Sequence, residues 1–429
     1  MLLNIINQSL FCYLVTQKSI KGSVCKMAIS VSSSGLNLLN EDLSLPCAVL
    51  YHSRIQNNLN WMQKFAEKNC VKLAPHGKTS MTPALFQLQL NSGAWAITLA
   101  TAPQIVSAYE HGIKRLMLAN QLIGKQNMRL IHEVISDREV EFYCLVDSVA
   151  NVEQLGQFFR DKNVNLNLLL EIGVASGRCG CRDKNSALQV IEAINRFKHL
   201  KLCGVEFYEG VIHGEDEVTL ISDFINSTIH FTHHLIETNC FDSQQVLLTG
   251  AGSAWYDVVA KTFTEAKLNS RIIPIIRPGC YLIHDTGIYQ EAQQAVVTRS
   301  QIACDLNNEL GADLQSSLEV WAYVQSIPEP GHVIIGMGKR NVAFDAGLPI
   351  PELIYRPDDQ QVNKVLNNWK VTDIMDQHAY LSCPVDADIA VGDMIAFSTS
   401  HPCLTFDKWR KIQLIDDSYR VKETLDTFF

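Results

Sequence analysis

The sequence lacks an excess of positive charge, long hydrophobic runs and repeated segments. Its 429 residues carry a formal net charge of −9 at pH 7 without a stripe of basic residues, so no nucleic-acid partner is expected. No apolar run approaches the length of a membrane span, and there is no solenoid repeat or low-complexity tract. Hydrophobic residues make up 47% of the chain and charged residues 19%. This composition predicts a soluble globular protein, long enough for two domains.

Cysteine spacing shows no disulfide framework. The thirteen cysteines are scattered and odd in number, which favours reduced thiols and a cytoplasmic protein. An apolar run from Leu10 to Val15 has no basic residue before it, unlike a signal peptide. We interpret the first residues as an extension, with Met27 as an alternative start.

Residues 46–285 alternate short apolar runs with longer amphipathic ones. The expected strands are 47–51, 71–74, 94–100, 115–118, 141–146, 167–172, 202–207, 245–248 and 271–276. The expected helices are 56–69, 83–91, 102–111, 125–136, 148–162, 186–197, 217–239 and 253–264. This α/β alternation predicts a parallel sheet with helical crossovers, and close to eight units suit a (β/α)8 TIM-type barrel. A doubly wound open sheet is the alternative, although no G-x-G-x-x-G follows a first strand.

Helical periodicity becomes scarce after about Tyr289. The expected strands there are 296–305, 318–326, 332–335 and 394–398, separated by turns such as Pro328–Gly331. These features predict a C-terminal β domain packed beside the barrel.

Lys78 lies in the segment Pro75–Thr79, which reads P-H-G-K-T. The segment follows a predicted strand, and active sites of α/β folds form at the carboxyl ends of strands. A desolvated lysine there becomes a nucleophile towards an aldehyde. A solvated loop lysine is the commoner alternative for any lysine alone, but here a proline, His76 and a hydroxyl accompany it.

This segment resembles the P-H-x-K-T motif of the D-serine dehydratase and D-threonine aldolase family. Its members are pyridoxal-phosphate (PLP) enzymes of the alanine-racemase-like, type III fold, and they commonly form homodimers. The resemblance implies that Lys78 carries PLP as a Schiff base. It also implies a division into an N-terminal extension (1–44) that partly completes the β domain, a PLP-binding barrel (45–288) and a mainly β domain with the metal motif (289–429).

A phosphate site is expected where residues 247–253, L-L-T-G-A-G-S, follow an apolar strand and open a helix. Small residues such as Gly250 and Gly252 let backbone N–H groups approach an anion at a helix N-terminus. Ser253 suits both the helix cap and a phosphate donor. A tight turn is the alternative, but the late position in the barrel and a resemblance to the family's phosphate loop favour phosphate.

Three further cofactor contacts come from the resemblance. Residues 177–180, G-R-C-G, are similar to a family G-R-x-G segment, so Arg178 is expected near the pyridine ring. Tyr208 matches a family tyrosine near the cofactor, with a packing role as the alternative. Tyr281, in a P-G-x-Y segment, is expected near the phosphate or ring, or else in the core.

His401 and Cys403 stand two positions apart, and imidazole and thiolate are both zinc ligands. Alone the pair is a weak signal, because two ligands rarely make a site. However, residues 400–409 resemble the C-terminal motif of D-serine dehydratase, in which H-x-C binds a catalytic zinc. The aldolase branch has aspartate where this chain has Cys403, which favours elimination chemistry, and a thiolate favours zinc.

The sequence therefore predicts a PLP- and zinc-dependent lyase. It would convert a β-hydroxy D-amino acid such as D-serine to ammonia and an α-keto acid. Lys78 is the expected base at Cα, and His76 is a weaker candidate. Zinc on His401 and Cys403 would activate the β-hydroxyl. The alternatives are a D-threonine-type retro-aldolase, an amino-acid racemase and a non-catalytic PLP-binding protein.

Overall fold

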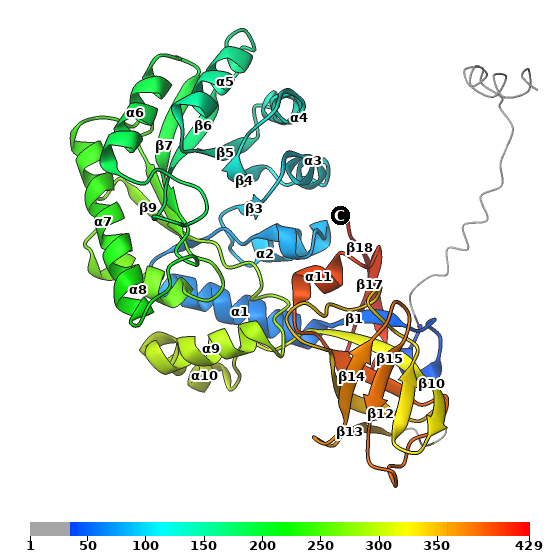
Figure 1. Ribbon diagram of the computed structural model, residues 1–429. Coiled ribbons are helices and arrows are strands. Elements are labelled where there is room, and N and C mark those ends of the chain that lie inside the picture. The colour runs from blue at the N-terminus through cyan, green and yellow to red at the C-terminus, as the bar shows by residue number, and fades with distance from the viewer. Residues whose placement is uncertain (1–34, 358, 360) are drawn as a thin grey trace, which may run out of the picture. The chain divides into compact units, whose positions relative to one another are not determined.

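The computed structural model describes residues 35–357, 359 and 361–429, and the expected alternative start at Met27 lies outside these ranges. Within them the chain forms an eight-stranded parallel sheet and a ten-stranded mixed sheet. Figure 1 shows the two sheets as separate groups of strands. A large buried core contains residues of both sheets, and two smaller buried clusters lie one in the parallel sheet and one in the mixed sheet.

The parallel sheet forms a closed barrel, with strand order β2-β9-β8-β7-β6-β5-β4-β3. Its strands are β2 (Lys72–Leu73), β3 (Ile97–Leu99), β4 (Arg115–Gln121), β5 (Glu141–Val146), β6 (Leu166–Ile172), β7 (Leu200–Phe207), β8 (Val246–Gly250) and β9 (Ile272–Ile276). Between the end strands β2 and β3, the amide of Trp95 donates to the carbonyl of Leu73 at 2.6 Å, and that of Thr98 to Pro75 at 2.9 Å. A parallel bridge joins His76 and Thr98. The predicted TIM-type barrel is confirmed.

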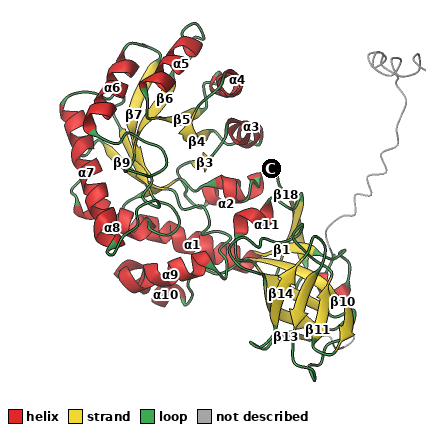
Figure 2. Ribbon diagram, viewed as in Figure 1, coloured by secondary structure: helices red, strands yellow, loops and turns green. Residues whose placement is uncertain are grey.

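Helices surround this barrel, as the red helices around the yellow strands show (Figure 2). They are α1 (His52–Lys68), α2 (Pro83–Asn91), α3 (Ala102–Glu110), α4 (Lys125–Ile135), α5 (Val149–Phe159), α6 (Lys184–Asn195), α7 (Glu217–Glu237) and α8 (Tyr256–Glu265). Along β8, Leu247 belongs to the interior cluster, whereas its neighbours Val246 and Leu248 belong to the larger core. This period-two pattern means that the barrel is filled on the inside by side chains and covered on the outside by helices.

The mixed sheet contains the strand Cys47–Tyr51, which the sequence had suggested as the first barrel strand. This strand, β1, pairs antiparallel with β10 (Leu318–Glu329) and parallel with β17 (Lys411–Ile415). The other members are β11 (His332–Ile335), β12 (Ile350–Tyr355), β13 (Val362–Lys364), β14 (Lys370–Ile374), β15 (Ala379–Ser382), β16 (Met394–Ser398) and β18 (Val421–Asp426). All five β1 residues are buried, and an apolar strand buried on both faces suits either sheet.

The predicted strand 296–305 is wrong, because the chain there is helical. Helices α9 (Ile288–Arg299) and α10 (Gln301–Leu310) meet at Ser300, whose hydroxyl accepts the amide of Ala303 at 3.3 Å. The β-branched residues of this stretch suggested a strand. Tertiary contacts decide otherwise: the indole of Trp61 on α1 donates to the side chain of Asn307 at 2.7 Å.

One short helix of the C-terminal region reaches the barrel. Helix α11 (Pro402–Phe406) packs on η2 (Gly77–Thr79), the single turn that follows β2. Figure 1 shows α11 beside α2. Residues separated by more than 300 positions in the chain are thereby brought to one place.

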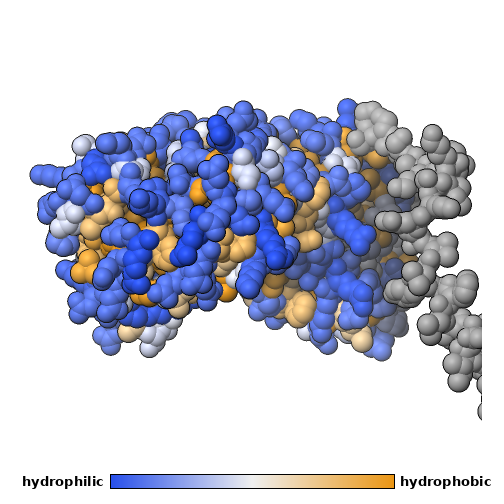
Figure 3. Space-filling view, turned by 90° about the horizontal axis from the view of Figure 1, so that it is seen from above, coloured by the Kyte–Doolittle hydropathy of each residue, from blue (hydrophilic) through white to orange (hydrophobic). Residues whose placement is uncertain are grey.

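The visible face in Figure 3 is mostly hydrophilic, with apolar areas between the hydrophilic ones. Among the helices that the structure describes, none is long and apolar enough to cross a membrane.

Candidate active site

A cavity of about 490 Å³ lies at the carboxyl ends of the barrel strands. Its walls come from the ends of β2, β3, β4, β7, β8 and β9, from the loop after β6, and from α9 and the start of α11. It contains most of the residues predicted from the sequence: His76, Lys78, Arg178, Tyr208, Gly252, Ser253, His401 and Cys403. The position agrees with the usual location of active sites in such barrels.

Lys78 is an exposed residue of η2, which follows the short strand β2 after the segment Ala74–His76. The glycine before it is required by packing, since a Cβ at Gly77 would lie 2.7 Å from the ring of Phe86. His76 is half-buried, and its Nδ1 has no hydrogen-bond partner among the described residues. Desolvation and the positive charges of Lys78, Arg277 and Arg178 lower the pKa of His76 well below its usual value. His76 is therefore neutral and a weak base.

The predicted phosphate loop is arranged differently from expectation. The amides of Ala251 and Gly252 donate to the carboxylate of Glu209, at 3.0 and 2.6 Å, rather than facing the cavity. The hydroxyl oxygen of Ser253 accepts the amides of Gly279 and Cys280 at 3.1 and 3.2 Å. Because that oxygen is already an acceptor, the Ser253 O–H remains free to donate. Ser253 thus offers a free hydroxyl donor at this corner of the cavity.

Two predicted residues are not part of the cavity wall. Gly250 is the last residue of β8, and a Cβ there would lie 2.2 Å from the ring of Phe207, so close packing explains the glycine. Tyr281 is buried, and its hydroxyl accepts a hydrogen bond from Gln89 at 3.1 Å. The structure therefore agrees with the alternative prediction, in which Tyr281 is a core residue.

Two arginines contribute positive charge to the cavity. The guanidinium of Arg178 stacks over the ring of Tyr208, 4.5 Å from its centroid. Arg277, immediately after β9, is buried and donates to Glu206 on β7. Sequence reasoning missed this ion pair, although the R-P-G segment at a strand end gave a signal for Arg277. Together with Lys78, these arginines give the cavity wall three cationic side chains, whereas Glu206 is the carboxylate among the described residues that line it.

The predicted metal pair lies at the side of the cavity formed by α11. Nδ1 of His401 is 2.7 Å from Oδ2 of Asp345. Hydrogen bonding to Cys403, followed by that to Asp345, raises the pKa of His401 to about 9. Hydrogen bonds from Cys280, His401 and Thr79 outweigh desolvation and lower the pKa of Cys403 to about 4. The Cys403 sulfur is therefore a thiolate, the form that binds metals.

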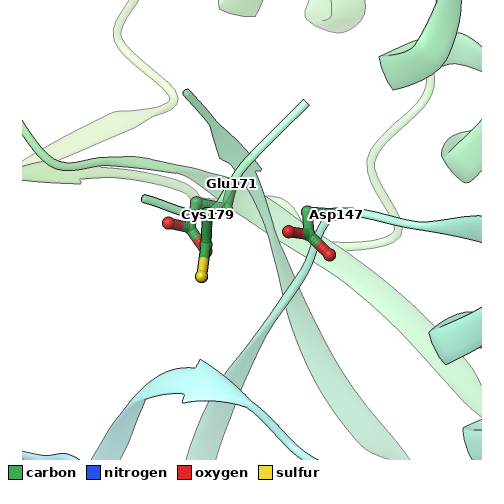
Figure 4. A group of neighbouring side chains, drawn as sticks. All are labelled: Asp147, Glu171 and Cys179. Atoms are coloured by element: carbon green, nitrogen blue, oxygen red, sulfur yellow. The ribbon is translucent and has the colours of Figure 1, made fainter. Parts of the chain in front are cut away.

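A second group of metal-capable side chains is formed by Asp147, Glu171 and Cys179, whose donor atoms lie within 4.8 Å of one another (Figure 4). Two of the three already have partners. Asp147 accepts the amide of Gly180, and Glu171 accepts from Gln121. Desolvation, with the nearby Glu206, raises the pKa of Glu171, which favours a protonated carboxyl and disfavours cation binding. We therefore assign no metal to this group.

The side chains present fit the two groups that the sequence predicts. An anionic cofactor would balance the excess of cations, and Glu206 Oε2, Arg277 Nε and His76 Nδ1 are buried atoms without partners among the described residues. Gly279 packs closely against His76, since a Cβ at Gly279 would lie 2.8 Å from Cβ of His76. At the other side, an imidazole oriented by a carboxylate and a neighbouring thiolate form a zinc-type donor set.

Comparison with known proteins gives two domain matches and structural similarity over about nine tenths of the chain. Residues 51–234 match the alanine racemase N-terminal domain, and residues 317–415 match the putative serine dehydratase domain. D-threonine aldolase of Arthrobacter sp. is 24% identical over 310 residues, which is 71% of this chain and 74% of that protein. The crystal structure of D-threonine aldolase from Filomicrobium marinum has a TM-score of 0.72 at 18% identity, covering 90% of this chain and 95% of its own.

D-threo-3-hydroxyaspartate dehydratase from Delftia sp. HT23 has a TM-score of 0.71 at 18% identity, covering 91% of this chain and 99% of its own. A cysteine-to-alanine variant of such a dehydratase has been solved in the metal-free form. Another solved variant replaces a histidine two positions before that cysteine.

The barrel, the mixed sheet and the two matched domains define a PLP enzyme of the alanine-racemase-like class. The resemblance to the D-serine dehydratase and D-threonine aldolase family that the sequence suggested is confirmed by these matches. The predicted enzyme type, a PLP-dependent lyase, is confirmed with it.

Proposed function

We propose that this protein is a PLP- and zinc-dependent lyase that converts a β-hydroxy D-amino acid, such as D-serine, to ammonia and an α-keto acid. The observation that carries the proposal is a single cavity with Lys78 on one wall, the Ser253 corner on another and the His401–Cys403 pair on a third. A reactive amine, an anion site and a metal-type donor set are the three components that such a reaction requires.

When bound, PLP supplies a carbonyl for the substrate amine and an electron sink at Cα, and zinc supplies a Lewis acid for the β-hydroxyl. The chain itself supplies positioning and proton transfer. Ser253, Arg178 and Tyr208 would hold the anionic and aromatic parts of the cofactor. Lys78 is the better candidate to accept the Cα proton, because the lowered pKa of His76 makes that imidazole a weak base.

The donor set supports elimination over retro-aldol cleavage. This chain has a histidine at position 401 and a cysteine at position 403. In the solved dehydratase variants a histidine and a cysteine with the same spacing are replaced one at a time, and the cysteine variant is in the metal-free form. A thiolate also favours zinc over harder divalent ions. Polarising the β-hydroxyl makes it a better leaving group, which is the step that elimination needs.

Retro-aldol cleavage of a D-threonine-type substrate is the second candidate. Its support is the similarity to D-threonine aldolase over 74% of that protein. The two reactions use the same kind of site and differ in the bond broken, Cα–H for elimination and Cα–Cβ for cleavage. Their products differ accordingly.

One incubation tests both candidates. The purified, PLP-saturated and zinc-loaded protein is given D-serine and, separately, D-threonine, with and without a chelator. Ammonia and keto acid that disappear on chelation are the expected result. An aldehyde plus glycine would instead identify an aldolase. A normal cofactor spectrum without any product would contradict both and return attention to racemisation or cofactor binding alone.

A cytoplasmic location is part of the proposal. The eleven cysteines within the described residues are all free, as expected in the reducing cytoplasm. The homodimer implied by the family remains a prediction, which light scattering on the purified protein would test.

A further inference from the structure

Cys280 lies directly beside the proposed metal ligand Cys403. Their sulfur atoms are 3.8 Å apart, although the two residues are separated by 123 positions in the chain. The hydroxyl of Thr79 lies 3.5 Å from the Cys403 sulfur and 3.8 Å from the Cys280 sulfur. All three side chains belong to the wall of the active-site cavity. The cavity therefore contains a second thiol at the metal pair, which the H-x-C motif does not include.

The backbone holds Cys280 in this place. Its amide donates to the hydroxyl oxygen of Ser253 at 3.2 Å, and its carbonyl accepts the amide of His284 at 2.6 Å. The residue is only 4% exposed. The backbone of Cys280 is hydrogen-bonded on both sides and its surroundings are packed, so its side chain has little freedom to turn away. The fold therefore holds the two sulfur atoms close together.

The separation of the sulfur atoms matches a shared metal ion. In a tetrahedral zinc site with Zn–S bonds of about 2.3 Å, two thiolate ligands lie roughly 3.8 Å apart. A disulfide would need a separation of about 2.05 Å. The observed 3.8 Å, at which the two sulfurs share a hydrogen bond, is also the spacing of two ligands on one zinc, and it is far longer than a disulfide bond.

We propose that Cys280 is a third protein ligand of the zinc ion held by His401 and Cys403. This inference rests on the proposed function, because it concerns the same metal. Catalytic zinc sites usually have three protein ligands and one open position, and the H-x-C pair alone is one ligand short. With Cys280 the site has an imidazole, two thiolates and one position for the substrate hydroxyl. The Cys280 thiol loses its proton to solvent as the Zn–S bond forms.

Binding requires a small closing movement. The donor atoms of His401, Cys403 and Cys280 do not all lie within 4.8 Å of one another in the described structure. The two sulfurs already have the required spacing, so we expect the imidazole to move. Asp345 bonds Nδ1 of His401 and leaves Nε2 for the metal. His401 is half-buried and Asp345 is exposed, so a shift of the two together costs less than a shift of the packed Cys280.

X-ray absorption at the zinc edge of the zinc-loaded, PLP-saturated protein tests this directly, because it counts sulfur neighbours. The expected count is two sulfur atoms at about 2.3 Å in the wild type. It falls to one in Cys280→Ser and to one in Cys403→Ser. The matched control is Cys304→Ser, a half-buried cysteine on α10 outside the cavity, for which the count stays at two. Zinc affinity should fall more than about tenfold in Cys280→Ser.

The outcomes separate this inference from the proposed function. One sulfur in the wild type, unchanged by Cys280→Ser and lost in Cys403→Ser, would overturn the third ligand and leave the H-x-C zinc site standing. A wild-type protein that binds no stoichiometric zinc would overturn both. The wild-type count decides the question even if the Cys280 variant does not fold.

Discussion

The imidazole of His401 is oriented by the carboxylate of Asp345, with Nδ1 and Oδ2 2.7 Å apart. The two residues lie 56 positions apart, His401 before helix α11 and Asp345 in the loop after β11. A carboxylate on one ring nitrogen fixes the ring orientation and leaves the other nitrogen for a metal. The pair therefore supports the histidine of the proposed zinc site through a residue that the motif does not contain.

Asp345→Asn should weaken zinc binding by about 10- to 100-fold, which is typical for the loss of such a carboxylate partner. The measurement is a competition titration of the zinc-loaded protein against a chelator. Asp376→Asn is the control, because Asp376 is exposed, forms a surface ion pair with Arg340 and lies outside the H-x-C motif. Equal zinc affinity in Asp345→Asn and the wild type would show that Asp345 does not position the ligand.

Lys78→Ala should abolish covalent attachment of the cofactor and reduce turnover by at least about 10²- to 10⁴-fold, the contribution of a positioned base. Reduction with borohydride followed by mass spectrometry detects the attachment. Lys72→Ala is a matched control, since Lys72 is an exposed lysine of the preceding strand. A Lys78→Ala protein that retains both the modification and full activity would disprove the assigned role.

Glu206→Gln should destabilise the protein by about 3–5 kcal/mol, because it leaves Arg277 as a buried charge without its partner. The side chains of Glu206 and Arg277 are 3% and 5% exposed. Chemical denaturation of the cofactor-free protein measures the change. The corresponding change Glu153→Gln, at an exposed ion pair with Arg196, should cost no more than about 1 kcal/mol. Similar losses at both sites would contradict the effect of burial.

Asp285 predicts a pH-dependent contribution to stability. Its Oδ1 accepts the amides of residues 287, 289 and 290, whereas Oδ2 is buried without a partner among the described residues. Desolvation raises its pKa from the usual 3.8 to about 6. The folded state therefore binds the extra proton between pH 4 and 6, and the contribution of Asp285 to the free energy of unfolding falls as the pH rises through this window.

In Asp285→Asn this pH dependence should be absent. The free energy of unfolding of the variant, relative to that of the wild type, should rise by up to about 3 kcal/mol between pH 4 and 6 and should stay constant above pH 6. Urea unfolding at several pH values measures the difference. Asp183→Asn is the control of opposite sign, because the Asp183 carboxylate caps α6 and its pKa is lowered. A flat difference between Asp285→Asn and the wild type would refute the raised pKa.

Local patterns in the sequence were sufficient to predict most of the strands and helices of the barrel. Strand Glu141–Val146 and helix Pro83–Asn91 appear with the bounds that their apolar periods predicted. The pattern could not tell which sheet Cys47–Tyr51 joins, because pairing partners are chosen by the whole fold. At 296–305 the β-branched residues indicated a strand, and packing against Trp61 and α1 imposed helices.

For the site, the sequence by itself determined the chemical types that are close together in the chain: the lysine of P-H-G-K-T and the histidine and cysteine of H-x-C. Only the tertiary structure decided their neighbours. Glu206, Arg277 and Cys280 reach the same cavity from distant strand ends and loops, and Asp345 contacts His401 at its side. The physical reason is that a motif records bonded neighbours, whereas charge pairing, desolvation and metal geometry depend on distances through space, which the closed barrel and the packing of α11 on η2 establish.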